Sequence, residues 1–237
     1  MIDTLLFDLD GTLLDIDMDI FLEHYLQSLT KRFEGIFLAS ELVSLIMAGT
    51  RAMIADSSPD RTNAEVFWEY FFSRVDYQPE DILPLFAQFY DEDFPRLAHL
   101  TSPKPEARQV LERALKKGFR LALATNPVFP RQAVVERLRW AGLEEIPFAV
   151  ITSYENMHAC KPHLAYYREI LAALDAEPRR CLMFGNDVAE DLPVAQLGVR
   201  TYLVEDHLLN MADRRFEPDY RGRLADVVSF LDRLDDM

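Results

Sequence analysis

Short apolar runs, rich in β-branched and aromatic residues, recur along the chain at strand-like length, with polar or glycine-containing segments between them. Such runs suit strands whose two faces are both covered. The pattern predicts five strands, at Thr4–Phe7, Phe119–Ala124, Phe148–Ile151, Cys181–Phe184 and Thr201–Val204.

Helical periodicity follows most of these runs. Pro105 suits a first helical position and Gly118 suits the end of the same helix. The predicted helices of this part of the chain span residues 105–117, 131–140, 162–174 and 224–234. Alternating strands and helices predict an α/β fold with a doubly wound, Rossmann-like parallel sheet. Ligands of such sheets bind beyond the carboxyl ends of the strands.

Residues 16–100 interrupt this alternation, because their apolar positions repeat with helical spacing and no run there resembles a strand. We therefore expect a Rossmann-like core made of residues 1–15 and 101–237, with an all-helical domain of residues 16–100 inserted after the first strand. The inserted segment contains the aromatic run VFWEYFFSRV, residues 66–75. Its rings suit either the core of a helix bundle or the lining of a pocket.

Composition and charge narrow the class of protein. The chain has 237 residues, of which 49% are hydrophobic and 27% charged, as expected of a globular protein with a core. A net charge of -15 disfavours a nucleic-acid-binding surface, which needs clustered Lys and Arg. Only Cys160 and Cys181 are present, so we expect no disulfide framework. Without a signal peptide or a membrane-spanning apolar stretch, the predicted location is cytoplasmic.

Two aspartates follow the first apolar run, in the stretch TLLFDLDGTLLD. Side chains alternate along a strand, so Asp8 and Asp10 project to the same side, at the edge of the sheet where ligands bind. Two carboxylates about 4 Å apart repel each other by roughly 4 kcal/mol at an effective dielectric constant of 20. A cation or a shared proton between them offsets this repulsion, and Mg²⁺ is a suitable cation because it prefers oxygen ligands.

The string DLDGT after a hydrophobic strand resembles the signature of the haloacid dehalogenase (HAD) superfamily of phosphohydrolases. The resemblance implies three further motifs, each near the end of a later strand. FRLALATNP supplies Thr125 and Asn126, whose hydroxyl and backbone N–H groups suit phosphoryl oxygens. CKPHLAYYREIL supplies Lys161, followed by Pro162 as the expected first residue of a helix.

The fourth motif is the acidic cluster in CLMFGNDVAEDL. Asp187 and Asp191 have the four-residue spacing of the family pair. In the family pattern the first acid usually follows the glycine directly, whereas here Asn186 stands between the glycine and Asp187. This departure leaves open which of Asp187, Glu190 and Asp191 bind the metal. We favour Asp187 as the ligand and Asp191 as its support.

The resemblance also implies the roles of these residues. Asp8 would be the nucleophile and form an aspartyl-phosphate, and Asp10 would be the general acid and base. Mg²⁺ would be held by Asp8, by the backbone carbonyl of Asp10 and by Asp187. Thr125, Asn126 and Lys161 would hold the phosphoryl oxygens, and Lys161 would also balance their charge.

An acid at position 10 favours cleavage of a phosphate ester, since the family members that cleave carbon–halogen or carbon–phosphorus bonds lack it. The sequence therefore predicts a Mg²⁺-dependent phosphatase whose partner is a small phosphorylated metabolite, with no nucleic acid and no membrane. Two alternatives are a sugar phosphomutase resembling β-phosphoglucomutase and a non-catalytic, phospho-binding regulatory protein. The oligomeric state is not predicted.

The helical insertion resembles the family's smaller helical cap, which closes over the site. Within it, AGTRAM places Gly49, Thr50 and Arg51 together. Arg51 is a candidate contact for an anionic or hydroxyl-rich substrate. The alternative is a glycine that ends a helix, followed by an arginine in solvent.

Overall fold

The computed structural model describes residues 1–212 and 215–234 of the chain. Its main sheet has six strands in the order β5-β4-β1-β6-β7-β8, and every neighbouring pair is parallel. The strands are β1 (Thr4–Phe7), β4 (Arg120–Leu123), β5 (Val150–Ile151), β6 (Cys181–Gly185), β7 (Arg200–Val204) and β8 (Tyr220–Gly222). The first strand lies in the interior of the sheet, so polar groups that follow it have strand ends on both sides.

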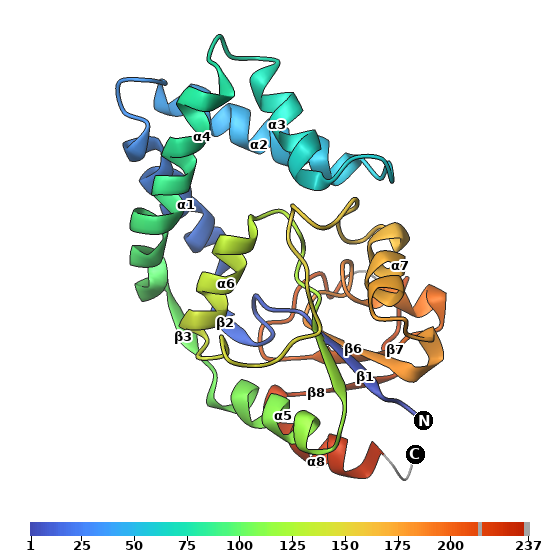
Figure 1. Cartoon of the computed structure of the whole chain (residues 1–237). Coiled ribbons are helices and arrows are strands. Elements are labelled where there is room, and N and C mark those ends of the chain that lie inside the picture. Colours follow the sequence, from blue (N-terminus) through green and yellow to red (C-terminus); the bar gives the residue numbers. More distant parts are fainter. Residues whose placement is uncertain (213–214, 235–237) are drawn as a thin grey trace.

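Helices cover both faces of the sheet because apolar side chains of β1 point both ways. Leu5 and Phe7 pack with residues of α5 (Pro105–Lys116) and α8 (Leu224–Arg233), which run side by side below the sheet (Figure 1). Leu6 points to the opposite face and packs with residues of α7 (Leu164–Ala173). The remaining core helices are α6 (Arg131–Trp140) and the short 3-10 segments η3 (Pro178–Arg180) and η4 (Leu192–Leu197).

The predicted α/β fold, with its doubly wound parallel sheet, is confirmed. All five predicted strands are present, and α6 has the predicted bounds. Gly118 has a φ of 84° just after α5, as a glycine that ends a helix requires. Pro162 is different, because α7 begins only at Leu164. The edge strand β8 was not predicted, because none of its three residues is buried and they form no apolar run.

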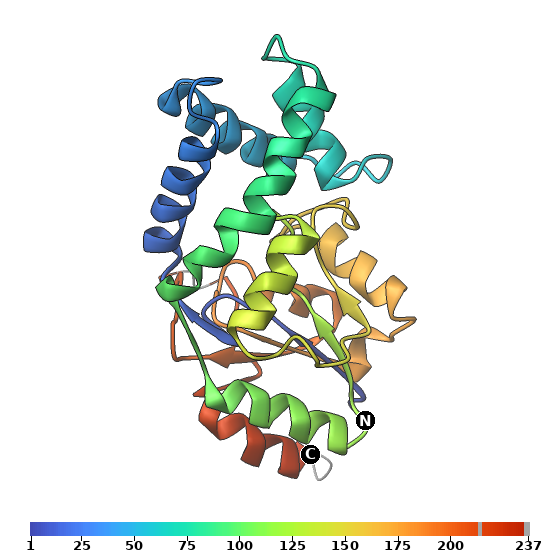
Figure 2. The same cartoon turned by 60° about the vertical axis from the view of Figure 1, so that its left-hand side comes forward.

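The inserted segment is helical throughout and stands above the sheet (Figures 1 and 2). Its elements are α1 (Met18–Arg32), α2 (Ala39–Ala55), α3 (Asn63–Phe72), α4 (Pro79–Gln88), the π-helical η1 (Phe89–Asp93) and the 3-10 helix η2 (Phe94–Leu100). Two short strands, β2 (Leu14–Ile16) and β3 (Thr101–Pro103), pair antiparallel at its two ends. The chain thus enters and leaves the insertion through one narrow stem. Among the described residues, no helix is both long and apolar enough to cross a membrane.

The start of α3 attaches the insertion to loops of the core. The backbone N–H of Asn63 donates to the Met157 carbonyl at 2.8 Å, and that of Ala64 donates to the Tyr154 carbonyl at 2.8 Å. The buried Asn63 amide also donates to the Ala159 carbonyl. Because buried amide groups are costly to leave unpaired, these bonds fix α3 above the core loops.

Candidate active site

Three neighbouring strands of the sheet deliver polar residues to the same edge. Asp8 follows β1, Thr125 lies two residues after β4, and Asp187 lies two residues after β6. Parallel strands end at one edge of a sheet, so these side chains converge. They border a cavity of about 250 Å³. Its polar lining consists of Asp8, Asp10, Thr125, Asn126, Asn186, Asp187, Glu190 and Asp191. We call it the acidic cavity.

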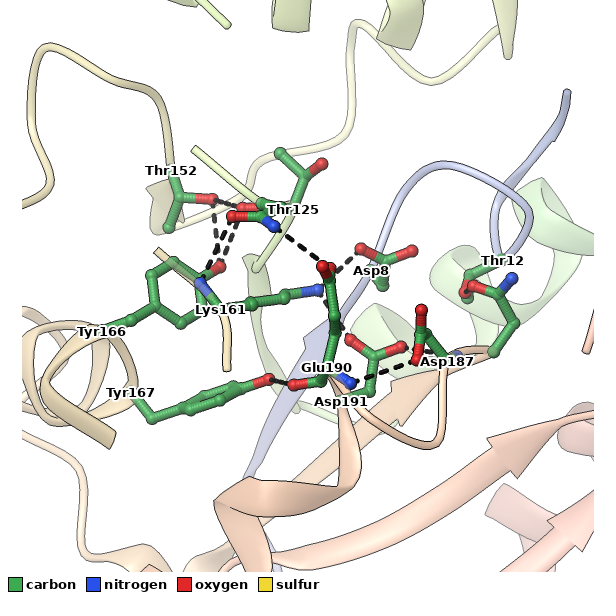
Figure 3. A network of polar contacts seen from close by, with 12 residues as sticks. Asp8, Thr12, Thr125, Thr152, Lys161, Tyr166, Tyr167, Asp187, Glu190 and Asp191 are labelled. Carbon is green, nitrogen blue, oxygen red and sulfur yellow. Dashed lines mark hydrogen bonds and ion pairs between the residues drawn. The ribbon is translucent and has the colours of Figure 1, made fainter. Parts of the chain in front are cut away.

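Lys161 joins two of the carboxylates that border this cavity (Figure 3). Its Nζ donates to Asp8 Oδ1 at 2.7 Å and to Asp191 Oδ1 at 2.7 Å, and its side chain is only 1% exposed. Burial alone would lower the pKa of Lys161, but Asp191 and Asp8 raise that pKa well above its usual value. The lysine is therefore a permanent buried cation against the predicted nucleophile.

Asp191 is almost completely buried and supports the site through its hydrogen bonds. Its Oδ2 accepts the backbone N–H of Asp187 at 3.0 Å, and burial raises the pKa of its carboxyl group. This packing depends on Gly185, because a Cβ at position 185 would lie 2.1 Å from Asp191 Oδ2. The glycine of the fourth motif thus leaves room for the carboxylate that holds Lys161.

Asn186, the residue by which the fourth motif departs from the family pattern, joins that motif to the first. Its Oδ1 accepts the Thr12 hydroxyl at 2.9 Å, and its Nδ2 donates to the His207 carbonyl. The amide packs directly over Gly11, where an added Cβ would lie 2.5 Å from Asn186 Nδ2. Gly11 also has a φ of 80°, so two independent constraints favour glycine there.

Asn126 connects the second and third motifs to Glu190. Its Oδ1 accepts the backbone N–H of Lys161 at 3.2 Å, and its Nδ2 donates to Glu190 Oε2 at 3.1 Å. Burial raises the pKa of Glu190 to about 7. The buried Thr125 backbone is fixed by the hydroxyl of Tyr166, which donates to the Thr125 carbonyl at 2.9 Å. The loops that border the acidic cavity are therefore tied to one another.

The donor set at this edge fits a hard cation. Asp8 and Asp187 both border the acidic cavity, and carboxylate and carbonyl oxygens are the ligands that Mg²⁺ prefers. Two segments hold Asp187. Its Oδ1 accepts the backbone N–H of Ala189, in its own loop, at 2.8 Å, and Nδ2 of Asn210, after β7, donates to both carboxylate oxygens. Within residues 1–212 and 215–234, no three Asp, Glu, His or Cys side chains form a preassembled metal cluster. A backbone carbonyl or water would have to supply the further ligands of a cation here.

Asp10 borders the acidic cavity and is held by Arg137 of α6, which no sequence motif indicated. Arg137 Nη1 donates to Asp10 Oδ2, and the guanidinium lies 4.7 Å from the centroid of the Phe129 ring. Burial raises the pKa of Asp10, and Arg137 offsets part of that rise. Asp10 Oδ1 and Arg137 Nη2 have no hydrogen-bond partner among the described residues. Arg137 thus fixes one carboxylate oxygen of Asp10, and the other oxygen is buried without a partner among the described residues.

A double-mutant cycle should show this pairing. Arg137→Met should lower the free energy of unfolding by about 3–5 kcal/mol, because it leaves a buried carboxylate without its cation. Adding Asp10→Asn removes that unpaired charge, so the double variant should be more stable than Arg137→Met alone. Urea unfolding of the four proteins measures the coupling free energy. Strict additivity of the two substitutions would show that the ion pair carries no coupling.

Arg51 lies apart from these residues. It is exposed on α2 and does not line the acidic cavity. The alternative interpretation, in which Gly49 ends a helix, is wrong, since α2 continues to Ala55. Gly49 instead provides close packing, because a Cβ there would lie 3.0 Å from the Phe67 ring. A contact of Arg51 with a substrate stays a prediction.

Comparison with known proteins identifies the family of the chain. The family model for haloacid dehalogenase-like hydrolases matches residues 2–198. The chain is 25% identical to the pyrophosphatase PpaX of Halalkalibacterium halodurans, over 96% of this chain and 97% of that one.

Two solved structures have similar folds. A HAD phosphatase from Thermococcus onnurineus gives a TM-score of 0.60 at 20% identity, over 97% of this chain and 98% of that one. The magnesium-bound HAD hydrolase YfnB of Bacillus subtilis gives 0.56 at 21% identity, over 98% and 99%. The family match spans all four motifs and most of the chain. The chain therefore belongs to the haloacid dehalogenase-like hydrolases.

Proposed function

We propose that this hydrolase is a Mg²⁺-dependent phosphatase that cleaves a small-molecule phosphate monoester through an aspartyl-phosphate on Asp8. The observation that carries the proposal is the ion pair of Asp8 with the buried Lys161. Asp8 borders the acidic cavity, and Asp10 and Asp187 border the same cavity. This cavity combines a nucleophile, a fixed cation and a second acid at one place.

In the first step, a carboxylate oxygen of Asp8 attacks phosphorus while the bond from phosphorus to the ester oxygen breaks. Asp10 gives its proton to the leaving oxygen, so the alcohol departs neutral. Its raised pKa suits this role, because the carboxyl group keeps a proton closer to neutral pH. Lys161 neutralises part of the negative charge that gathers on Asp8 and the phosphoryl oxygens.

In the second step, water attacks phosphorus and passes a proton to Asp10, and the acyl-phosphate bond to Asp8 breaks. Inorganic phosphate leaves, and both aspartates return to their starting states. Asp8, Asp187 and the backbone carbonyl of Asp10 would hold Mg²⁺. When bound, the ion supplies positive charge that screens the nucleophile from the anionic substrate.

We also propose that residues 16–100 form a cap domain over this site. The support is the narrow β2–β3 stem and the contact of α3 with the core loops. Met18, at the start of α1, borders the acidic cavity, so the insertion provides part of its wall. A wall of this kind excludes water from the phosphoryl group.

Removal of the metal tests the proposed function. Chelation of divalent ions should reduce phosphate release from p-nitrophenyl phosphate by at least about 10²-fold, because the charge that stabilises the transition state is lost. Added Mg²⁺ should restore the rate. Release that is unchanged in chelator would contradict metal dependence, and no release with Mg²⁺ from any small phosphate ester would favour the non-catalytic alternative.

A further inference from the structure

A second cavity, of about 160 Å³, lies between the helical insertion and the core. Its lining comes from α1, α2, α3, α4 and η1 on one side and from loop residues 128–130 and 154 on the other. Phe67 and Trp68, from the aromatic run of α3, are part of this lining, whereas Phe71 is buried in the helix bundle. Both alternatives for that run are therefore realised by different rings. We call this the apolar cavity.

The apolar cavity adjoins the acidic cavity. Met18, Val128 and Phe129 border both of them. A phosphate ester whose phosphoryl group reached Asp8 would therefore have its leaving group close to this shared wall. The two cavities have opposite chemistry, because carboxylates surround one and aliphatic and aromatic side chains surround the other.

Three hydroxyl groups in the lining of the apolar cavity have partners within the protein. The hydroxyls of Tyr25 and Tyr90 form a hydrogen bond of 2.9 Å, and the Thr50 hydroxyl donates to the Ile46 carbonyl at 2.9 Å. Burial raises the pKa of Tyr25 to about 12, so this phenol is neutral at physiological pH. A sugar in this cavity would have to compete for these groups or leave its own hydroxyls unpaired.

The apolar cavity also lacks charge. No Asp, Glu, Lys or Arg is among the described residues that line it. The nearest buried cation described above, Arg137, is paired with Asp10 and lies against the Phe129 ring. A second phosphate, as in pyrophosphate, would enter this cavity without a counter-charge. The lining thus disfavours the substrate that the name of the PpaX relative indicates.

The size of the cavity suits one ring. An engineered protein cavity of about 150 Å³ lined by Leu, Ile and Phe side chains stays dry and binds benzene. We propose that the apolar cavity binds the leaving group of the phosphate monoester, and that this group is apolar and about the size of a single aromatic ring. This inference rests on the proposed phosphatase function and specifies its class of substrate.

A set of three substrates tests the inference. Benzyl phosphate, glycerol 3-phosphate and pyrophosphate are each incubated with the enzyme and Mg²⁺, and phosphate release is measured. Benzyl phosphate should have a kcat/KM at least about 10²-fold above the other two, because only its leaving group matches the apolar lining. Equal or faster hydrolysis of glycerol 3-phosphate or pyrophosphate would overturn the inference while leaving the phosphatase function in place.

Two phenylalanine substitutions locate the effect. Thr50→Phe fills the apolar cavity and should reduce the preference for benzyl phosphate over glycerol 3-phosphate at least about tenfold. Ser44→Phe adds the same ring at an exposed position of the same helix and should keep the wild-type preference. A preference that survives Thr50→Phe unchanged would place the leaving group elsewhere.

A binding measurement separates failure of the inference from failure of the proposed function. Benzyl alcohol is titrated into the wild-type protein while tryptophan fluorescence is recorded. The chain has two tryptophans, and only Trp68 lines the apolar cavity, so Trp68→Phe should abolish the saturable change. If no ester is hydrolysed, the phosphatase function fails, and a saturable Trp68 signal still supports an apolar ligand. No signal in the wild-type protein would overturn the ligand class.

Discussion

Asp8→Asn should reduce phosphate release by about 10⁴–10⁶-fold, because an amide cannot attack phosphorus and no covalent intermediate can form. The stability of the protein should change little. The amide oxygen can still accept the hydrogen bond that Lys161 now donates to Asp8 Oδ1, and Lys161 keeps its second partner, Asp191. Steady-state phosphate release and thermal unfolding of the same preparation measure the two effects.

A matched control and a chemical trap make this result specific. Asp60→Asn, in the exposed loop between α2 and α3, has the same change of charge and should keep wild-type activity. Acid quenching of the wild-type enzyme during turnover should give a phosphorylated protein that hydroxylamine cleaves, as an acyl phosphate requires. Asp8→Asn should give none. More than about 1% residual turnover in Asp8→Asn would be inconsistent with Asp8 as the nucleophile.

The positions at strand ends could be predicted because their geometry is local. Asp8 and Thr125 each follow an apolar run, and parallel strands bring such ends together whatever the rest of the fold does. The acid after the fourth strand obeys the same rule, although the spacing alone left Asp187 and Asp191 as alternatives. Both border the acidic cavity, but their partners differ, since Asp191 bonds Lys161 whereas Asp187 bonds Ala189 and Asn210. Their roles in metal binding stay predictions.

Arg137 could not be predicted from a motif, but a signal was present in α6. Ala133, Val134 and Leu138 are buried, and Arg137 has the helical spacing that places it among them. A charged residue within a buried helical stripe needs a partner of opposite charge, so its presence indicates an ion pair. The identity of that partner, Asp10, depends on how α6 packs against the loop after β1. The sequence of neither segment alone determines that packing.

The residues of the helical insertion that line the apolar cavity could not be predicted, because their positions depend on contacts between helices. The glycine at position 49 was interpreted as a possible helix end, whereas it is a point of close packing against Phe67. Once α2 continues past that glycine, helical periodicity turns Thr50 toward the apolar cavity and leaves Arg51 exposed. Rotation of one helix thus decides which of two adjacent side chains lines this cavity.

Lys161→Met should reduce turnover by at least about 10³-fold and lower the free energy of unfolding by about 3–5 kcal/mol. The kinetic loss follows because the lysine is the fixed cation beside the nucleophile. The loss of stability follows because Asp8 and Asp191 are left buried without their shared counter-charge. Phosphate release and urea unfolding measure the two effects separately.

The double variant Lys161→Met/Asp191→Asn distinguishes electrostatic stabilisation of the reaction from structural support. It removes one unpaired carboxylate, so it should recover part of the lost stability and none of the lost turnover.

The pH dependence of stability provides an independent check. Burial already raises the pKa of Asp191, and removing Lys161 removes an interaction that lowers it. A carboxyl group whose pKa is higher in the folded state stabilises the protein at low pH and loses that stabilisation as the pH rises through the folded-state value. Lys161→Met should therefore be more stable at pH 5 than at pH 8, and the double variant should lose most of this difference. If turnover returned together with stability in the double variant, Lys161 would be a structural residue, and the cation beside Asp8 would have to come from the metal alone.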